Sequence, residues 1–353
     1  MPEPKLFVSH QSALEFWRHH DLSRSGGIRR TRAGSVKEGT SALCHIKPLA
    51  RTAMPSSGRI YGMRVDDSLA ACLTDLQITE LPLHVMVGKS ENRQCRGGIV
   101  SHFYERILPE GSLCRVSDNV YVASPELTLC QMSTCLPFID LIELCLEFCS
   151  GYALNPENTD RGFDDRPPLT TASRLASYVA HYEGRRGANL TKRALRYVID
   201  DSASPMETHV LMLLCLPSKL GGHELPMPRH NVSIPITDRA RSHTGRTHLL
   251  CDLYWEEFHL DVECDSTMYH TSKEQLGIDS DRRIILDAMK YKYVGITSSQ
   301  LEDPEKLLNV VQAIRRAMGL RLRNTPDHIA AKREALRAYL TTPAAQRLPL
   351  RFP

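Results

Sequence analysis

Four acidic residues of one short stretch stand where they can hold a metal ion. Residues 247–270, THLLCDLYWEEFHLDVECDSTMYH, contain Asp252, Asp261, Glu263 and Asp265 but no Lys or Arg. Like charges on one face destabilise a sheet, and hard divalent cations take carboxylate oxygens as ligands. The stretch therefore predicts a Mg²⁺ or Mn²⁺ site. The alternative is a sheet face turned to water, where acids are ordinary.

Two strands joined by a tight turn are the elements expected to position these acids. Apolar residues take every second position from Phe258 to Cys264, which is the period of a strand. With the turn at Glu256-Glu257, Asp252 lies opposite Asp261, and directly opposed residues share a face. All four acids are then expected on the same side of the sheet.

Phosphodiester hydrolysis is the chemistry that such a site favours. It needs an activated water and neutralised phosphate charge, and a metal held by carboxylates supplies both. We expect Asp252 and Glu263 to bind the metal, with the Cys264 carbonyl as a candidate third ligand. Asp265 is expected to orient a second water or ion. Glu207, in the first turn of a helix, is expected to hold a metal-bound water, or else to be an acid favoured by the helix dipole.

Residues after the hairpin are candidates for contact with substrate. His270 is close enough in sequence to act as an acid or base or to contact phosphate; the alternative is a hydrogen-bonded structural histidine. Arg282 and Arg283 stand where they can clamp a nucleic-acid backbone. The alternative for both arginines is a solvated helix face.

Composition bounds the class of protein. The 353 residues suffice for about two domains, and 42% hydrophobic with 24% charged residues is ordinary for a folded soluble chain. No apolar run has the length of a membrane span, and the N-terminus lacks a signal-peptide core. Most of the eleven Cys sit in apolar runs, typical of buried thiols in a reducing compartment. We therefore expect a cytoplasmic protein without a membrane partner. Two of the cysteines, Cys145 and Cys149, have the spacing of zinc ligands on one helix turn. No second Cys or His pair follows at the spacing of a zinc finger, so a structural zinc site is not expected.

Charge is uneven along the chain. The net charge is +3, whereas residues 1–60 carry ten basic and four acidic residues. That excess can attract nucleic acid, or it can be a solvated basic surface. Glu143 and Glu147 are spaced i, i+4 on a predicted helix, where a solvated acidic stripe is expected.

The predicted organisation has four parts. Residues 1–155 form an N-terminal α+β domain, and residues 156–200, which begin in the polar, proline-rich LNPENTDRGFDDRPP, form a linker with helices. Residues 201–323 read as α-β-β-β-α-β-α, a mixed sheet flanked by helices. Residues 324–353 form a C-terminal helix and tail.

This element order, with acids at these positions, resembles the PD-(D/E)XK nuclease superfamily. More narrowly, it is similar to the very-short-patch-repair-like endonuclease domains of bacterial proteins linked to abortive infection and toxin–antitoxin systems. The resemblance covers about residues 200–320. Glu207 matches the family's helix glutamate, and Asp252, in LLCDLYW, matches the second-strand aspartate. The third-strand pattern E-x-D-G-x-x-H is matched by Glu263, Cys264, Asp265, Ser266, Thr267, Met268, Tyr269 and His270.

Two positions depart from the superfamily pattern. Asp265 stands where the superfamily has lysine, as it does in this subfamily, and Ser266 replaces the usual glycine. Lys273 is near enough to stand in for the missing lysine. The charged helix that follows in the family is matched by Asp279, Asp281, Arg282 and Arg283.

The resemblance implies a restriction-endonuclease-like α-β-β-β-α-β core behind an α+β N-terminal domain. It implies a Mg- or Mn-dependent endonuclease, acting on DNA in preference to RNA, in a setting such as phage defence. A second hypothesis is a catalytically inactive, antitoxin-like regulator that binds nucleic acid. A third is a module that binds a protein partner, or a second copy of itself, through the apolar N-terminal half.

Overall fold

The computed structural model divides the chain into two compact units. The first comprises Met1–Val198 with Leu350–Pro353, and the second comprises Ile199–Pro349. The segment predicted as a linker with helices lies in the first unit up to Val198, and the predicted C-terminal helix lies in the second. The structure describes residues 6–19, 51–52, 76–88, 90, 93, 95–96, 98–104, 108–116, 120–241, 247–265, 282–322 and 325–343.

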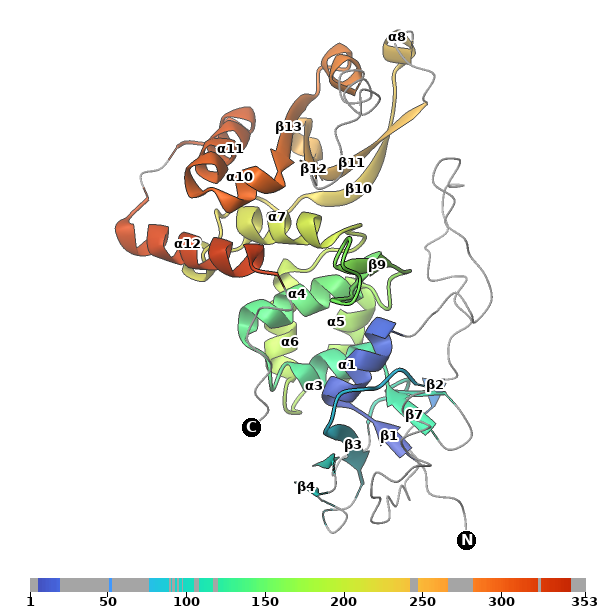
Figure 1. The fold of residues 1–353 in the computed structure, drawn as a ribbon. Coiled ribbons are helices and arrows are strands. Elements are labelled where there is room, and N and C mark those ends of the chain that lie inside the picture. Colours follow the sequence, from blue (N-terminus) through green and yellow to red (C-terminus); the bar gives the residue numbers. More distant parts are fainter. Residues whose placement is uncertain are drawn as a thin grey trace. The chain divides into compact units, whose positions relative to one another are not determined.

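A mixed sheet is the centre of the first unit (Figure 1). Its strands are β1 (Leu6–Val8), β2 (Arg51–Thr52), β3 (Leu83–Val87), β4 (Cys95–Arg96), β5 (Ile99–Phe103), β6 (Leu113–Arg115) and β7 (Val120–Ala123). Within the described residues their order is β2-β6-β7-β1-β3-β5-β4, with β1/β7 and β3/β5 parallel. Both β3 and β7 are buried along their whole length. That burial explains why LHVMV and VYVA are almost entirely apolar.

Helices of the first unit contact this sheet or one another. They are α1 (His10–His19), α3 (Pro125–Met132), α4 (Phe138–Phe148), α5 (Ala172–His181), α6 (Ala188–Ala194) and the short η3 (Leu195–Tyr197). A hairpin of β8 (Tyr152–Leu154) and β9 (Phe163–Asp165) lies between α4 and α5 in sequence. Helix α3 begins where Ser124 Oγ accepts the Leu127 N–H at 3.3 Å, with Pro125 in the first turn. Both features favour a helix start.

The two glutamates of α4 are buried, so the expected solvated stripe is wrong. Glu143 is 7% exposed and Glu147 is fully buried. Arg18 of α1 donates to both carboxylate oxygens of Glu147, from Nε at 2.9 Å and from Nη2 at 2.7 Å. A buried carboxylate requires such a partner. The helix pattern alone could not reveal it, because the arginine lies 129 residues away in the sequence.

The second unit is built on a smaller mixed sheet. Its strands are β10 (Arg229–Pro235), β11 (His248–Trp255), β12 (Leu260–Asp265) and β13 (Lys292–Thr297). Among the described residues the order is β10-β11-β12-β13, antiparallel except for the parallel pair β12/β13. Parallel neighbours need a crossover connection, and residues 282–288 of that connection are helical. The predicted mixed sheet is confirmed.

The second unit also contains helices, as predicted. They are α7 (Pro205–Cys215), η4 (Ser218–Leu220), α8 (Asp238–Arg241), η5 (Glu256–Phe258), α10 (Ser298–Glu302), α11 (Pro304–Ala317) and α12 (Asp327–Thr341). Helix α7 contacts β11 and β12, and α11 contacts β13. The apolar run VLMLLC of α7 is buried, so this helix supplies a large part of the core.

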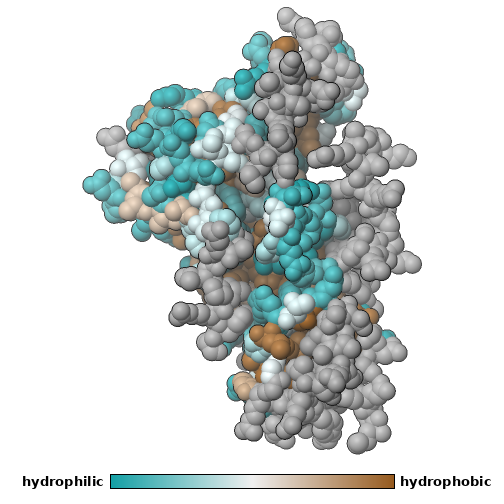
Figure 2. All heavy atoms as spheres, in the orientation of Figure 1, coloured by the Kyte–Doolittle hydropathy of each residue, from teal (hydrophilic) through white to brown (hydrophobic). Residues whose placement is uncertain are grey.

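Helix α11 buries an apolar side and leaves its polar side exposed. Leu307, Val310, Val311 and Ile314 form the buried side of α11. Figure 2 shows a largely hydrophilic surface over α10 and α11, with a few paler residues between. In the part of the chain that the structure describes, no helix is both long and apolar enough to cross a membrane.

Candidate functional site

The β11–β12 hairpin pairs in a register two residues from the expected one. Its pairs are Leu253↔Val262, Tyr254↔Asp261 and Trp255↔Leu260, so Asp261 lies opposite Tyr254 and not Asp252. The predicted two-residue turn is wrong, because η5 and His259, in a left-handed conformation with φ 47°, lengthen the connection. A shift of two residues leaves every side chain on its original face.

The four predicted acids therefore share one side of the sheet. We call Asp252, Asp261, Glu263 and Asp265 the acidic cluster. Asp261 is fully buried, and the other three are half-buried. Alternation along a strand places residues i and i+2 on the same face, as the strand pattern predicted.

Asp252 and Glu263 are joined beyond the last pair of the ladder. The main-chain N–H of Asp252 donates to Glu263 Oε1 at 3.1 Å, and the Cys264 N–H donates to Asp252 Oδ2 at 2.9 Å. Each carboxylate thus takes a main-chain donor of the opposite strand. Cys264, whose carbonyl was a candidate metal ligand, is tied here through its N–H group.

Burial and mutual repulsion favour protonation of this pair. Burial, followed by the nearby charge of Glu207, raises the pKa of Asp252 to about 7. Burial and the charges of Asp252 and Asp261 raise the pKa of Glu263 to about 9. Both raised pKa values mean that the ionised form of each carboxyl is disfavoured, by burial and by neighbouring negative charge. A divalent cation bound between the two carboxyls would favour their ionised forms.

Arg282 supplies part of the compensation from outside the hairpin. Its Nη2 donates to Asp261 Oδ2 at 2.9 Å, to the Leu250 carbonyl at 2.5 Å, and to Glu263 Oε1. Its side chain is only 13% exposed. The guanidinium predicted to clamp a nucleic-acid backbone is therefore directed into the acidic cluster.

Glu207 is hydrogen-bonded to the residues that begin α7. Ser204 Oγ accepts the Glu207 N–H at 3.2 Å, while the Glu207 carboxylate accepts from the Ala203 N–H at 2.8 Å. Asn231 Nδ2 also donates to that carboxylate, at 3.0 Å. Burial raises the pKa of Glu207 despite these bonds. The structure brings Glu207 within electrostatic reach of Asp252, and its side chain holds the first turn of the helix.

Asp265 faces β13 beside a glycine. A Cβ added at Gly295 would lie 3.4 Å from Asp265 Oδ2 and 3.3 Å from the Tyr293 hydroxyl. Burial and the charge of Asp265 raise the pKa of Tyr293 to about 12. The Arg283 guanidinium lies 5.3 Å from the Tyr293 ring centre, and Arg283 is exposed. Arg283 is thus the predicted phosphate contact that faces solvent.

The donor chemistry of the acidic cluster fits a hard cation, with two carboxylates adjacent across the strands. Within the described residues, however, no three His, Cys, Asp or Glu side chains converge as a ready ligand set. A bound ion would share Glu263 with Arg282 or displace it. His270, Lys273, Asp279 and Asp281 lie outside the described residues. Cys145 and Cys149 are buried and are not joined in a disulfide.

Sequence reasoning missed the role of Asn231 and the inward direction of Arg282. Asn231 adopts a left-handed conformation with φ 48°, which asparagine tolerates better than most residues. Its contact with Glu207 spans 24 positions and leaves no local signal. Comparison with protein-family models, with curated proteins and with solved structures finds no match for this chain.

Proposed function

We propose that Ile199–Pro349 is a metal-dependent nuclease domain with a restriction-endonuclease-like core. It hydrolyses phosphodiester bonds of nucleic acid, with DNA favoured over RNA. The observation that carries the proposal is the contact of Asp252 with Glu263, two carboxyls whose pKa values are raised by burial and by neighbouring negative charge. The order of α7, three antiparallel strands, a helical crossover and a parallel fourth strand supports it.

In this proposal Asp252 and Glu263 hold Mg²⁺ or Mn²⁺. When bound, the ion activates water and neutralises charge on the phosphate. Glu207 fixes the start of α7 near Asp252, and Asp265 orients a water on the β13 side. The exposed Arg283 contacts the phosphate backbone.

A specific contact favours a second candidate, a nucleic-acid-binding regulator without catalysis. Arg282 forms ion pairs with both Asp261 and Glu263. A guanidinium in that position neutralises the acids without a metal, as in a nuclease fold that has lost its chemistry. The two candidates differ in whether the acidic cluster binds a divalent ion and supports cleavage.

The deciding experiment measures Mn²⁺ binding by calorimetry and cleavage of plasmid, single-stranded DNA and RNA. The variants are Asp252→Asn and Glu263→Gln, which keep side-chain size. The matched control is Glu257→Gln, an exposed acid in the turn of the same hairpin.

Loss of both cleavage and Mn²⁺ binding in the two variants, with both retained in the control, supports the nuclease. Nucleic-acid retention in a gel shift without cleavage or Mn²⁺ binding supports the regulator. Absence of cleavage, metal binding and retention overturns both candidates.

A further inference from the structure

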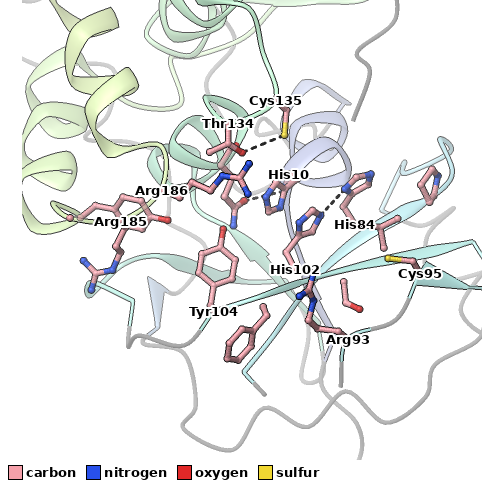
Figure 3. Close-up of a pocket in the computed structure, with 17 residues that line it drawn as sticks. His10, His84, Arg93, Cys95, His102, Tyr104, Thr134, Cys135, Arg185 and Arg186 are labelled. Carbon is pink, nitrogen blue, oxygen red and sulfur yellow. Dashed lines mark hydrogen bonds between the residues drawn. The ribbon is translucent and has the colours of Figure 1, made fainter. Parts of the chain in front are cut away.

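The first unit contains a cavity of about 970 Å³ beside β3 and β5 (Figure 3). Small-molecule sites typically measure roughly 300–1,000 Å³, so this one has room for a ligand of nucleotide size. Its wall carries six basic side chains: His10, His84, His102, Arg93, Arg185 and Arg186. Among the lining residues that the structure describes there is no Asp or Glu. The cavity is therefore lined by one sign of charge.

Three histidines from three different elements meet in this cavity. The ring of His10, from α1, stacks on the ring of His102, from β5, with centres 3.5 Å apart. His84 Nδ1, from β3, lies 2.9 Å from His102 Nε2. Figure 3 shows the three imidazoles in a row across the cavity.

These imidazoles are neutral at pH 7. Burial, the other two histidines and Arg186 hold the pKa of His10 well below its usual range. Burial, His84 and two arginines lower the pKa of His102 to about 4. A neutral imidazole offers one N–H donor and one acceptor. The row can therefore donate to an anion without adding a full charge.

The arginines provide the charge around this row. The charge of Arg186 reaches both His10 and His102, and Arg93 reaches His102. Arg185 donates to the His181 carbonyl at 3.0 Å and lies 5.2 Å from the Tyr182 ring centre. Its guanidinium is thus oriented before any ligand arrives. Guanidinium groups match phosphate oxygens by paired N–H donors.

The lining also offers groups suited to a nucleobase. Phe103 is 36% exposed at the cavity wall, beside Tyr104. Aromatic faces stack on bases with little dependence on sequence.

We propose that this cavity is a binding site for a nucleotide phosphate. The arginines bind the phosphate, the histidine row donates to it, and the aromatic wall takes the base. The ligand is either a free nucleotide or the phosphorylated end of a nucleic-acid strand. This proposal concerns the first unit and is independent of the nuclease proposal.

The test is calorimetric titration of the full chain with AMP and with adenosine, which lacks the phosphate. The main variant is the double substitution Arg93→Ala and Arg186→Ala. Both side chains are exposed, so we expect their loss to leave the fold intact. The control is Arg196→Ala, an exposed arginine of the same unit outside the cavity. A second variant, His102→Gln, tests the histidine row.

We expect AMP to bind about tenfold or more tightly than adenosine, because charge-assisted hydrogen bonds carry the phosphate. The double variant and His102→Gln weaken AMP binding by a similar factor, and the control leaves it unchanged. Equal affinity for adenosine, unchanged AMP affinity in the double variant, or no binding of AMP overturns the proposal.

Competition with short oligonucleotides separates the two sources of phosphate. Displacement of AMP by a 5′-phosphorylated strand but not by its 5′-hydroxyl counterpart assigns the cavity to a strand end. Displacement by neither strand assigns it to a free nucleotide. Equal displacement by both strands contradicts a terminal phosphate as the ligand and overturns the proposal.

Discussion

Asp252 and Glu263 are tied across the end of the β11–β12 ladder, where the N–H of Asp252 donates to the carboxylate of Glu263 at 3.1 Å. Neither acid can move without disturbing the strand opposite. Arg282 is bonded to the same Glu263 oxygen. Main-chain donors thus hold Asp252 and Glu263 in place. The guanidinium of Arg282, which mutation can remove, balances part of the negative charge of the acidic cluster. This relationship makes Arg282 the most informative residue to change.

Replacing Arg282 with Ala is expected to destabilise the second unit. Loss of one partner leaves Asp261 and Glu263 buried with uncompensated charge, which costs about 3 kcal/mol for a buried pair. Urea unfolding of the variant and the parent at pH 8 measures the change. Mn²⁺ should restore part of the loss if the ion occupies the cluster. Arg283→Ala is the control, and equal stability of the two variants would contradict the prediction.

Removing the cap of α7 should have a smaller effect. Ser204→Ala deletes the acceptor of the Glu207 N–H and is expected to cost about 1 kcal/mol, as for other N-caps. Thermal unfolding followed by circular dichroism measures it. Ser218→Ala, whose hydroxyl caps no helix, should change stability by less. A Ser204→Ala variant as stable as the parent would show that the cap bond is dispensable.

The ion pair inside the first unit is expected to matter more than one at its surface. Arg18→Ala leaves Glu147 buried without its bidentate partner, a loss of about 3 kcal/mol. Arg161→Ala breaks the exposed ion pair with Asp165 and should lower the free energy of unfolding by less than about 1 kcal/mol. Urea unfolding of the two variants, side by side, compares them. Similar losses would refute the distinction.

Stability of the second unit should fall as pH drops below about 6.5, partly through His223. Burial and two neighbouring arginines lower the pKa of this 6%-exposed histidine to about 3. The unfolded chain binds the proton first, so stability is lost between the unfolded pKa of about 6.5 and the folded value. The slope is about 1.4 kcal/mol per pH unit for one such group.

His223→Gln should flatten this slope in unfolding experiments at several pH values. His248→Gln, at an exposed position, is the control and should leave the slope unchanged. Raised carboxyl pKa values act in the opposite direction and are common to both variants. The difference between the two variants therefore isolates His223, and identical slopes would contradict the prediction.

The sequence was sufficient for the parts of the fold that local patterns determine. Alternation from Leu260 to Cys264 predicted β12 and its acidic face. Glu207 was expected in the first turn of a helix, and it lies in the first turn of α7. The hairpin register was not predictable, because it depends on a three-residue turn and a left-handed His259. An even shift preserved the predicted face, and an odd one would have reversed it.

Long-range partners were beyond the reach of sequence patterns. Arg18 reaches Glu147 from 129 residues away, and spacing on one helix says nothing about such a partner. The histidines of the cavity come from α1, β3 and β5, with no common spacing. Only the pairing of β1 with β3 and of β3 with β5 brings them together.

One cysteine on the cavity wall, Cys95, can report whether the cavity is occupied, through its rate of chemical labelling. Of the nine cysteines that the structure describes, Cys95 is the exposed one, and its side chain lies on the cavity wall. Burial raises the pKa of thiols such as Cys145 and Cys215, which slows their alkylation because the thiolate is the nucleophile. In a chain with Cys44 and Cys72 replaced by Ser, the rate of maleimide labelling would report whether Cys95 is shielded. Occupancy of the cavity thereby becomes readable by mass spectrometry, without knowledge of the ligand.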